Sequence, residues 1–289
     1  MDFVKYQHVE RLGTDKVNGI LNGIVHVFPK IDGTNTSLWM DNGELCVGNR
    51  RNKLNYELDN YHSYEILRKI DKYTKFFQEF PNLRLYGEFL VPIHIKSYQK
   101  DAWRKFYVFD VMDGDRYLTY DEYKPMLEKF AIEYIPCMGV YENPTQDEIC
   151  NLCDKGMFLQ VEGGRPEGIV VKNYGYKNYA GEQIWAKVIS AEFKRKTPID
   201  TISGSVEEKI VFKYITPSFI EKEYSKFINE VGGWDVKYIQ RLFNSIWHVL
   251  IEEEMWNIIK RLKNPTIDFR KLYSMMCDEI KKVKPELFK

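Results

Sequence analysis

Short runs of apolar and β-branched residues, separated by turn residues, fill the stretch from residue 20 to residue 195. Such runs predict strands, and in chain order they are GIVHVFPK, NTSLWM, ELCVGN, LRLYGEFLV, FYVFDVM, EGIVVKN and QIWAKVI. Asn42-Gly43 predicts a hairpin turn between two of them. Helical spacing occurs in NYHSYEILRKIDKYTKFFQEF and LTYDEYKPMLEKF. The pattern predicts an α+β domain with largely antiparallel sheets and flanking helices.

Past residue 200 the apolar residues recur at helical spacing instead. TPSFIEKEYSKFINEVGG has a threonine before a first-turn proline and ends in two glycines, which is typical of a complete helix. Two further helical stretches follow, WDVKYIQRLFNSIWHVLIEEEMWNIIKRLKNP and IDFRKLYSMMCDEIKKVKPELF. We therefore expect a first domain over residues 1–198 and a small all-α C-terminal domain over 199–289, joined near Lys194 to Ser205.

Composition narrows the class of protein only a little. The 289 residues are 44% hydrophobic, and 42 basic residues balance 42 acidic ones, so net charge does not indicate a nucleic-acid partner. No apolar run approaches the roughly 20 residues that span a bilayer, so we expect no membrane partner. The five scattered cysteines favour reduced thiols and a cytoplasmic setting. Cys150 and Cys153 form a single CxxC, which fits two partly buried thiols on a helix better than zinc.

Lys30 is the first candidate for chemistry, because it ends an apolar strand and precedes a tight Asp32-Gly33 turn. This arrangement presents an amine at the edge of a sheet. Partial desolvation or nearby cations lower the pKa of a lysine, and the neutral amine is a nucleophile. Taken alone, the same residues also describe a hairpin turn with a solvated lysine.

The motifs that follow Lys30 resemble the covalent nucleotidyltransferase superfamily, which comprises DNA ligases, RNA ligases and mRNA capping enzymes. KIDGTN resembles the nucleophile motif of these enzymes. The later motifs appear in the same order as in the superfamily, between Lys30 and Lys187, and are VGNRR, LYGEFL, FYVFDV, EGIVVK and IWAKVI. Six short motifs in the right order and spacing are hard to obtain by chance.

The resemblance implies a catalytic set of three lysines. Lys30 would attack the α-phosphorus of ATP and expel pyrophosphate. Lys172 and Lys187 would contact the α-phosphate and neutralise the charge that builds on it. The same two cations would help to keep Lys30 neutral.

The resemblance also implies contacts to the nucleotide. Glu88 would accept a hydrogen bond from a ribose hydroxyl, and Arg50 would bind a phosphate of the nucleotide or of the 5′ end being joined. Strand alternation places Tyr107 and Phe109 on one face. The resemblance selects Phe109 to stack on adenine, although an ordinary core aromatic would occupy the same position.

Three residues of the motifs have roles that stay open. Asp32 and Glu167 are candidates to hold Mg²⁺ or Mn²⁺, directly or through water. Glu167 is alternatively a group that positions Lys30. Asn35 would contact the nucleotide or the RNA end, or be a turn residue.

The helical C-terminal region distinguishes between the branches of the superfamily. DNA ligases and capping enzymes generally continue into a small β-barrel, which should show several short alternating strands. The helical pattern here is similar to the RNA ligase 2 family, which seals nicks in RNA duplexes. The resemblance implies RNA ends in a nicked duplex as substrate and the formation of a lysyl-AMP intermediate. We expect a monomer without a protein partner, acting in the cytoplasm, with a phage or virus as a suitable source.

Two positions depart from the family pattern. Ile189 stands where many relatives carry a second lysine of the last motif, and Lys194 and Lys196 are candidates to supply that charge. Pro29 stands where ligase 2 relatives often have an acid. The open alternatives are a DNA ligase, a capping-type guanylyltransferase and an inactive nucleic-acid-binding scaffold.

Overall fold

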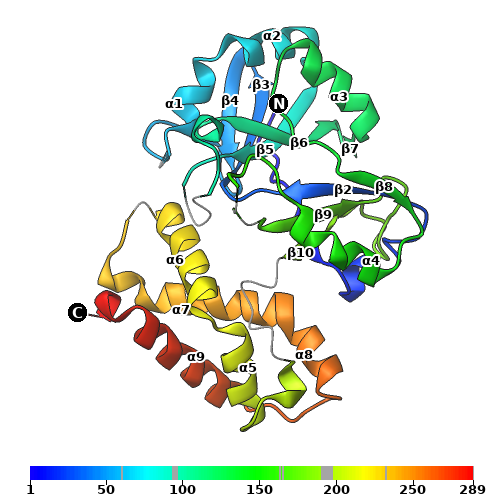
Figure 1. Cartoon of the computed structure of the whole chain (residues 1–289). Helices are drawn as coiled ribbons and strands as arrows, with labels where there is room; N and C mark the ends of the chain where they lie inside the picture. Colours follow the sequence, from blue (N-terminus) through cyan, green and yellow to red (C-terminus); the bar gives the residue numbers. More distant parts are fainter. Residues whose placement is uncertain are drawn as a thin grey trace. The chain divides into compact units, whose positions relative to one another are not determined.

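The computed structural model divides the chain into two compact units (Figure 1). The first unit comprises Met1–Leu12 with Lys16–Val188, and the second comprises Gly13–Asp15 with Ile189–Lys289. The structure describes residues 1–59, 61–92, 97–162, 164, 166–189, 198–231 and 233–288, and the side chains of 226, 229 and 230 lie outside this description. Residues 190–197 fall in a gap, so the boundary after residue 198 stays a prediction.

One five-stranded sheet of the first unit has β2 one strand in from its edge. In spatial order its strands are β1 (Glu10–Arg11), β10 (Ala186–Ile189), β9 (Gly168–Lys172), β2 (Ile24–Lys30) and β8 (Gly139–Glu142). Strand β2 runs antiparallel to both β8 and β9, whereas β1 and β10 are parallel. Val25 and Val27 of β2 are fully buried. A strand bonded on both sides holds its last residue, Lys30, in a fixed position.

The second sheet is antiparallel, with β4 at one edge and β7 at the other. In spatial order its strands are β4 (Glu44–Asn49), β3 (Thr34–Asp41), β5 (Leu83–Phe89), β6 (Phe106–Asp113) and β7 (Arg116–Tyr117). Asn42 and Gly43 join β3 to β4 with φ of 49° and 80°. Two consecutive positive φ values are what a two-residue hairpin turn of type I′ requires, so the predicted turn is confirmed.

Three helices, α1 (Ser63–Arg68), α2 (Asp71–Glu79) and α3 (Tyr120–Lys129), cover the second sheet and bury their apolar faces in one core (Figure 1). A fourth helix, α4 (Gln146–Asn151), packs Ile149 into the core of the first sheet instead. The single helix predicted over NYHSYEILRKIDKYTKFFQEF is in fact two, because Ile70 has an extended backbone with φ −98° and ψ 104°. Leu67 on one side of this break and Phe76 on the other are both fully buried.

The second unit is all-helical, as the sequence predicts. Its helices are α5 (Val206–Tyr214), α6 (Pro217–Val231), α7 (Ile239–Val249), α8 (Met255–Arg261) and α9 (Phe269–Val283). A π-helical turn, Leu250–Glu254, joins α7 to α8. Helix α5 begins with a capping box between Ser205 and Glu208, and the sequence pattern had not indicated it as a separate helix. In the described part of the chain no helix is long and apolar enough to cross a bilayer.

Candidate active site

Lys30 and Glu167 form an ion pair at the end of β2. The antiparallel register sets Lys30 opposite Gly168, so the residue just before β9 lies beside the lysine. The Lys30 Nζ to Glu167 Oε2 distance is 2.7 Å. Glu167 is 1% exposed and Lys30 is 26% exposed. The amine is thus held by a buried carboxylate while part of the lysine side chain stays accessible.

Glu88 of β5 reaches the turn that follows Lys30. The backbone N–H of Gly33 donates to Glu88 Oε1 at 3.0 Å. A Cβ at Gly33 would lie 2.5 Å from the carbonyl oxygen of Phe89 and 3.1 Å from the Cα of Leu90. Only glycine permits this close approach of the turn to the end of β5. Close packing therefore explains why the KIDG motif has glycine at position 33.

The carboxyl group of Glu88 has a strongly perturbed acidity. Burial, together with the negative charges of Glu167 and Asp32, raises its pKa from 4.5 to about 8, against opposing effects from Lys30 and the Gly33 N–H. A carboxyl group with this pKa is mostly protonated at neutral pH and can donate as well as accept a hydrogen bond. A perturbed acid beside a partly exposed lysine is typical of a functional site.

Asp32 is the third acid of this cluster and is 4% exposed. Its backbone N–H donates to the hydroxyl of Tyr98 at 2.9 Å. Among the described residues, no three His, Cys, Asp or Glu side chains are arranged to hold a metal ion. Mg²⁺ commonly takes one or two carboxylates and completes its shell with phosphate oxygens and water. Asp32 and Glu167 fit that kind of site, and their role as metal ligands stays a prediction.

Lys172 lies deep in the fold. It is 2% exposed, and its Nζ donates to Asp110 Oδ1 at 2.7 Å and to the carbonyl oxygen of Phe109. The other Asp110 oxygen accepts from Tyr6 at 2.6 Å and from the Trp185 indole at 3.1 Å. Burial lowers the pKa of Lys172, and the charge of Asp110 opposes that change. The contact of Lys172 with the α-phosphate stays a prediction, because the structure engages its ammonium with Asp110.

Phe109 lies in β6 and is partly exposed, with its ring centroid 5.9 Å from the Lys172 Nζ. Its ring centroid is 4.9 Å from that of Tyr6. Tyr107 and Phe109 join one core cluster, whereas Phe106 and Val108 join another. The predicted alternation of β6 is therefore confirmed, and the stacking of Phe109 on adenine stays a prediction.

The remaining motif residues lie on neighbouring strands. Asn35 of β3 is paired in register with Glu88. Lys187 is partly exposed on β10, opposite Arg11 of β1. Arg50 follows β4, is exposed, and its guanidinium lies 2.9 Å from His8 Nδ1. Arginine can only donate, so His8 Nδ1 accepts and carries no proton in this contact.

The structure thus brings four of the predicted residues into one direct cluster, namely Lys30, Asp32, Glu88 and Glu167. Sequence reasoning missed three residues that hold the predicted ones, and these are His8, Tyr98 and Asp110. Only Asp110 carried a signal, since it follows Phe109 inside a motif. Lys194 and Lys196, candidates for the missing cation near Ile189, lie outside the described residues.

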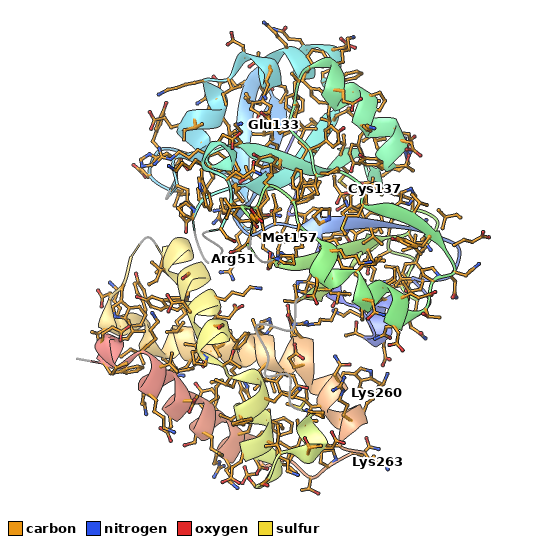
Figure 2. The ribbon with its side chains drawn as sticks, viewed as in Figure 1. Arg51, Glu133, Cys137, Met157, Lys260 and Lys263 are labelled. Carbon is orange, nitrogen blue, oxygen red and sulfur yellow. The ribbon has the colours of Figure 1, made fainter. Side chains whose placement is uncertain are left out.

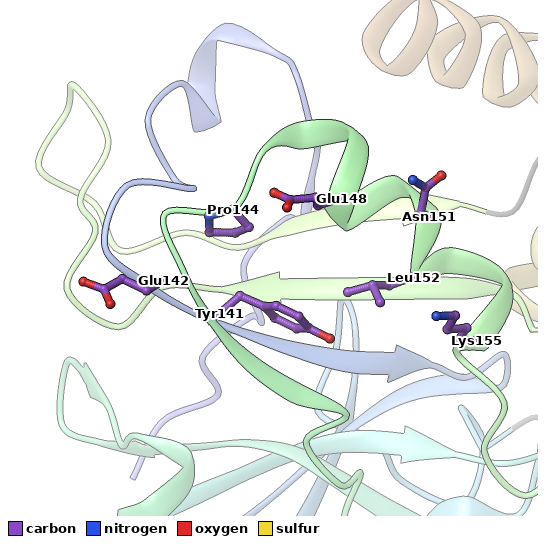
Figure 3. A pocket seen from close by; sticks show the side chains of 7 residues that line it. All are labelled: Tyr141, Glu142, Pro144, Glu148, Asn151, Leu152 and Lys155. Carbon is purple, nitrogen blue, oxygen red and sulfur yellow. The ribbon is translucent and has the colours of Figure 1, made fainter.

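A hollow elsewhere in the first unit is separate from this cluster. It lies against β8 and α4 (Figure 3). Its lining residues are Tyr141, Glu142, Pro144, Glu148, Asn151, Leu152 and Lys155. None of the motif residues lines this hollow. Lys30, and Glu88 with its raised pKa, therefore identify the chemical site better than the shape of this surface does.

The comparisons with known proteins agree with the motifs. The family model described as RNA ligase matches residues 23–189, which is more than half of the chain. The chain belongs to the RNA ligase family. The matched segment of this RNA ligase family member contains all nine predicted site residues, from Lys30 to Lys187. A search of curated proteins finds no match.

Solved structures similar to this RNA ligase family member support the fold. A variant of the Naegleria gruberi RNA ligase with ATP and manganese has a TM-score of 0.51 and 21% identity, over 65% of this chain and 56% of that one. A second variant of that ligase, with AMP and manganese, has a TM-score of 0.51 and 19% identity over the same shares. The match spans little more than half the length of those chains. At this identity it confirms the α+β nucleotidyltransferase fold alone.

Several basic residues of the second unit carry no assigned role. Lys260 and Lys263 are exposed at the end of α8 (Figure 2). Lys260 lies over the Trp256 ring, 4.8 Å from its centroid. Cations at a helix C-terminus are favoured by the helix dipole, so these residues need no ligand to explain them.

Proposed function

We propose that this chain is an ATP-dependent RNA ligase that joins a 3′-hydroxyl to a 5′-phosphate through AMP bound covalently to Lys30. Membership in the RNA ligase family supports this activity. The observation that carries the proposal is the Lys30–Glu167 pair, 2.7 Å long, beside Glu88, a carboxyl group whose pKa burial raises to about 8. A partly exposed lysine with an adjacent buried carboxylate has both a path to substrate and a partner for its proton.

The reaction has three phosphoryl-transfer steps. Lys30 Nζ forms a bond to the α-phosphorus of ATP, and the bond to pyrophosphate breaks. The AMP group then passes to the 5′-phosphate of an RNA end, which frees Lys30. Finally a 3′-hydroxyl attacks that 5′-phosphorus and displaces AMP. Each step moves negative charge at phosphorus, so nearby cations lower its barrier.

The side chains of this chain account for the first step. A carboxylate at 2.7 Å stabilises the ammonium form of Lys30. Attack therefore requires that Glu167 accept the proton or that its charge be offset when substrate arrives. Glu88 would accept a hydrogen bond from a ribose hydroxyl, and Phe109 offers a ring for adenine. Asp32 and Glu167 would hold Mg²⁺ or Mn²⁺, which supplies charge neutralisation at the phosphates.

The substrate and setting belong to the same proposal. The helical second unit is similar to that of the RNA ligase 2 family, which favours a nicked RNA duplex and a role in RNA repair. The N. gruberi variants were solved with ATP or AMP and manganese, which supports ATP and a divalent metal here. The five cysteines are free thiols, which fits a reducing cytoplasm. A monomer and a phage or viral source complete the proposal.

The test begins with labelled ATP and Mg²⁺, followed by denaturing electrophoresis. We expect label on the wild type and on a Lys53→Ala control, and none on Lys30→Ala. Nicked RNA and nicked DNA duplexes with a 5′-phosphate then identify the substrate. Label from GTP alone would indicate a guanylyltransferase, and sealing of DNA alone a DNA ligase. A folded wild type that takes no label from either nucleotide would indicate an inactive scaffold.

A further inference from the structure

A basic loop joins β5 to β6 in the first unit. We call residues Ser97–Lys105 the β5–β6 loop. Its three cations, Lys100, Arg104 and Lys105, are exposed, and its one acid is Asp101, so the loop carries a net charge of 3 − 1 = +2. No described residue forms an ion pair with any of the three cations.

One side of this loop is fixed to the turn that carries the nucleophile. The Tyr98 hydroxyl accepts from the N–H of Asp32 at 2.9 Å. Arg104 N–H donates to Leu90 O at 2.8 Å, and Leu90 N–H donates to Lys105 O at 2.9 Å. A Cβ on Gly33 would lie 3.1 Å from the Cα of the same Leu90. The cations therefore project from backbone that packs directly on the Lys30 turn and the end of β5.

The other side of the β5–β6 loop is fixed to the segment that leads to Glu167. Tyr98 forms an antiparallel bridge with Gln160. Gln99 N–H donates to Leu159 O at 2.8 Å, and Val161 N–H donates to Ser97 O at 2.8 Å. The loop is thus bonded to the Asp32 turn, to Leu90 two residues after Glu88, and to residues 159–161, which precede Glu167 in the sequence.

Arg104 has a backbone conformation that disfavours arginine. Its φ is 58°, in the left-handed region where glycine is favoured and a long side chain is strained. The half-buried Trp103, which meets Tyr98 edge-on at 5.4 Å between centroids, anchors the loop at this point. Glycine would fit this backbone with less strain.

We propose that Lys100, Arg104 and Lys105 bind backbone phosphates of the RNA beside Lys30. The inference rests on the proposed ligase function and deepens it by naming a substrate contact. Exposed, separated cations fit a polyanion better than they fit a nucleotide, because small-ligand sites are concave and bury most of the ligand. Lys100, Arg104 and Lys105 form no ion pair with any described residue. When such cations bind RNA phosphates, they displace the counterions that surround the RNA.

The first test measures binding of the full chain to a labelled RNA duplex with one 5′-phosphorylated nick, without ATP or metal. The Lys100→Ala/Arg104→Ala/Lys105→Ala variant should bind more weakly, and its plot of log K against log salt should be shallower by about 1 for each cation. The matched control is Arg116→Ala/Lys124→Ala/Lys129→Ala, which removes three cations that each have a carboxylate partner. The control should keep most of the wild-type slope.

The second test uses Arg104→Gly, which separates structure from function. The variant relieves the left-handed strain, so its Tm should equal or exceed that of the wild type while its RNA affinity falls. An affinity equal to the wild type in both this variant and the triple variant would overturn the proposal.

Labelling with ATP distinguishes the failure of this inference from the failure of the proposed function. The triple variant should take label on Lys30 as fast as the wild type, because that step involves no RNA. A raised KM for ATP with unchanged RNA affinity would assign the cations to the nucleotide phosphates and overturn the RNA contact. If the wild type binds RNA but takes no label, the ligase proposal is wrong. The binding measurements on the variants still test the phosphate contact in that case.

Discussion

Lys30, Glu167, Glu88 and Asp32 meet although the sequence separates them by up to 137 positions. The motifs identified all four, because each lies at a strand end or in a turn with a distinctive short pattern. The side chains that support them were not predictable in the same way. Tyr98 reaches Asp32 through a hydroxyl contact across 66 positions, and no local pattern of residues marks such a contact.

The pKa of Glu88 gives a prediction for stability against pH. Its folded-state pKa of about 8 lies above the ordinary 4.5, so between these values the folded protein holds a proton that the unfolded chain releases. The contribution is full below the lower value and is lost as pH rises through the higher one. As the pH rises from 4.5 to about 8, we expect the free energy of unfolding of the wild type to fall relative to that of Glu88→Gln, by on the order of 2 kcal/mol.

Urea unfolding of both proteins at a series of pH values measures this difference. Glu79→Gln, at an exposed acid of α2, serves as the control and should follow the wild type. Parallel curves for wild type and Glu88→Gln would show that Glu88 titrates normally in the folded state.

The Lys172–Asp110 pair gives a second prediction at the residue scale. Both side chains are at most 2% exposed, and removal of one partner leaves a buried charge uncompensated. We expect Lys172→Met to lower the free energy of unfolding by about 3–5 kcal/mol. The double variant Lys172→Met/Asp110→Asn should recover part of that loss, because asparagine retains an acceptor for Tyr6 and Trp185. Equal stability of the wild type and Lys172→Met in chemical denaturation would contradict the buried pair.

At the scale of elements, the sequence predicts what has strong local periodicity. The β3–β4 hairpin, β2, α6 and α9 follow from turn residues and repeating apolar positions, whereas α5 was not indicated as a separate helix. Strands β1 and β7 have only two residues each, too short for any alternation to be visible. The break between α1 and α2 was also missed, since the apolar spacing continues through Ile70 and only the core beneath decides where the helix turns.

The contact between the KIDG turn and the end of β5 gives a prediction about an element. Gly33→Ala places a Cβ 2.5 Å from the Phe89 carbonyl oxygen, which is backbone and has little freedom to move. We expect a loss of stability of about 1–3 kcal/mol and a larger loss of labelling by ATP, because the turn carries Lys30.

Gly175→Ala is the matched control for this change. A Cβ there would meet only the Asn173 side chain, at an ordinary 3.5 Å. If Gly33→Ala were labelled as fast as Gly175→Ala, the close packing of the turn would be irrelevant to the reaction.

At the scale of the whole molecule, the first unit contains all nine residues that the motifs predict for nucleotidyl transfer. The helical second unit was predictable as a class from its apolar spacing, but its role in binding RNA is a proposal. The metal prediction belongs to this scale because it concerns every step. Because Asp32 and Glu167 are the predicted ligands of a divalent cation, we expect EDTA to abolish labelling and excess Mg²⁺ or Mn²⁺ to restore it. Full labelling in EDTA would rule out a required metal.

The position of the covalent AMP tests the central proposal most directly. The full chain is incubated with ATP and Mg²⁺ and digested, and the modified peptide is sequenced by mass spectrometry. The structure predicts AMP on Lys30, which is partly exposed beside Glu167, and none on Lys172, which is buried against Asp110. AMP on Lys172, or no AMP on a chain shown to be folded, would contradict it.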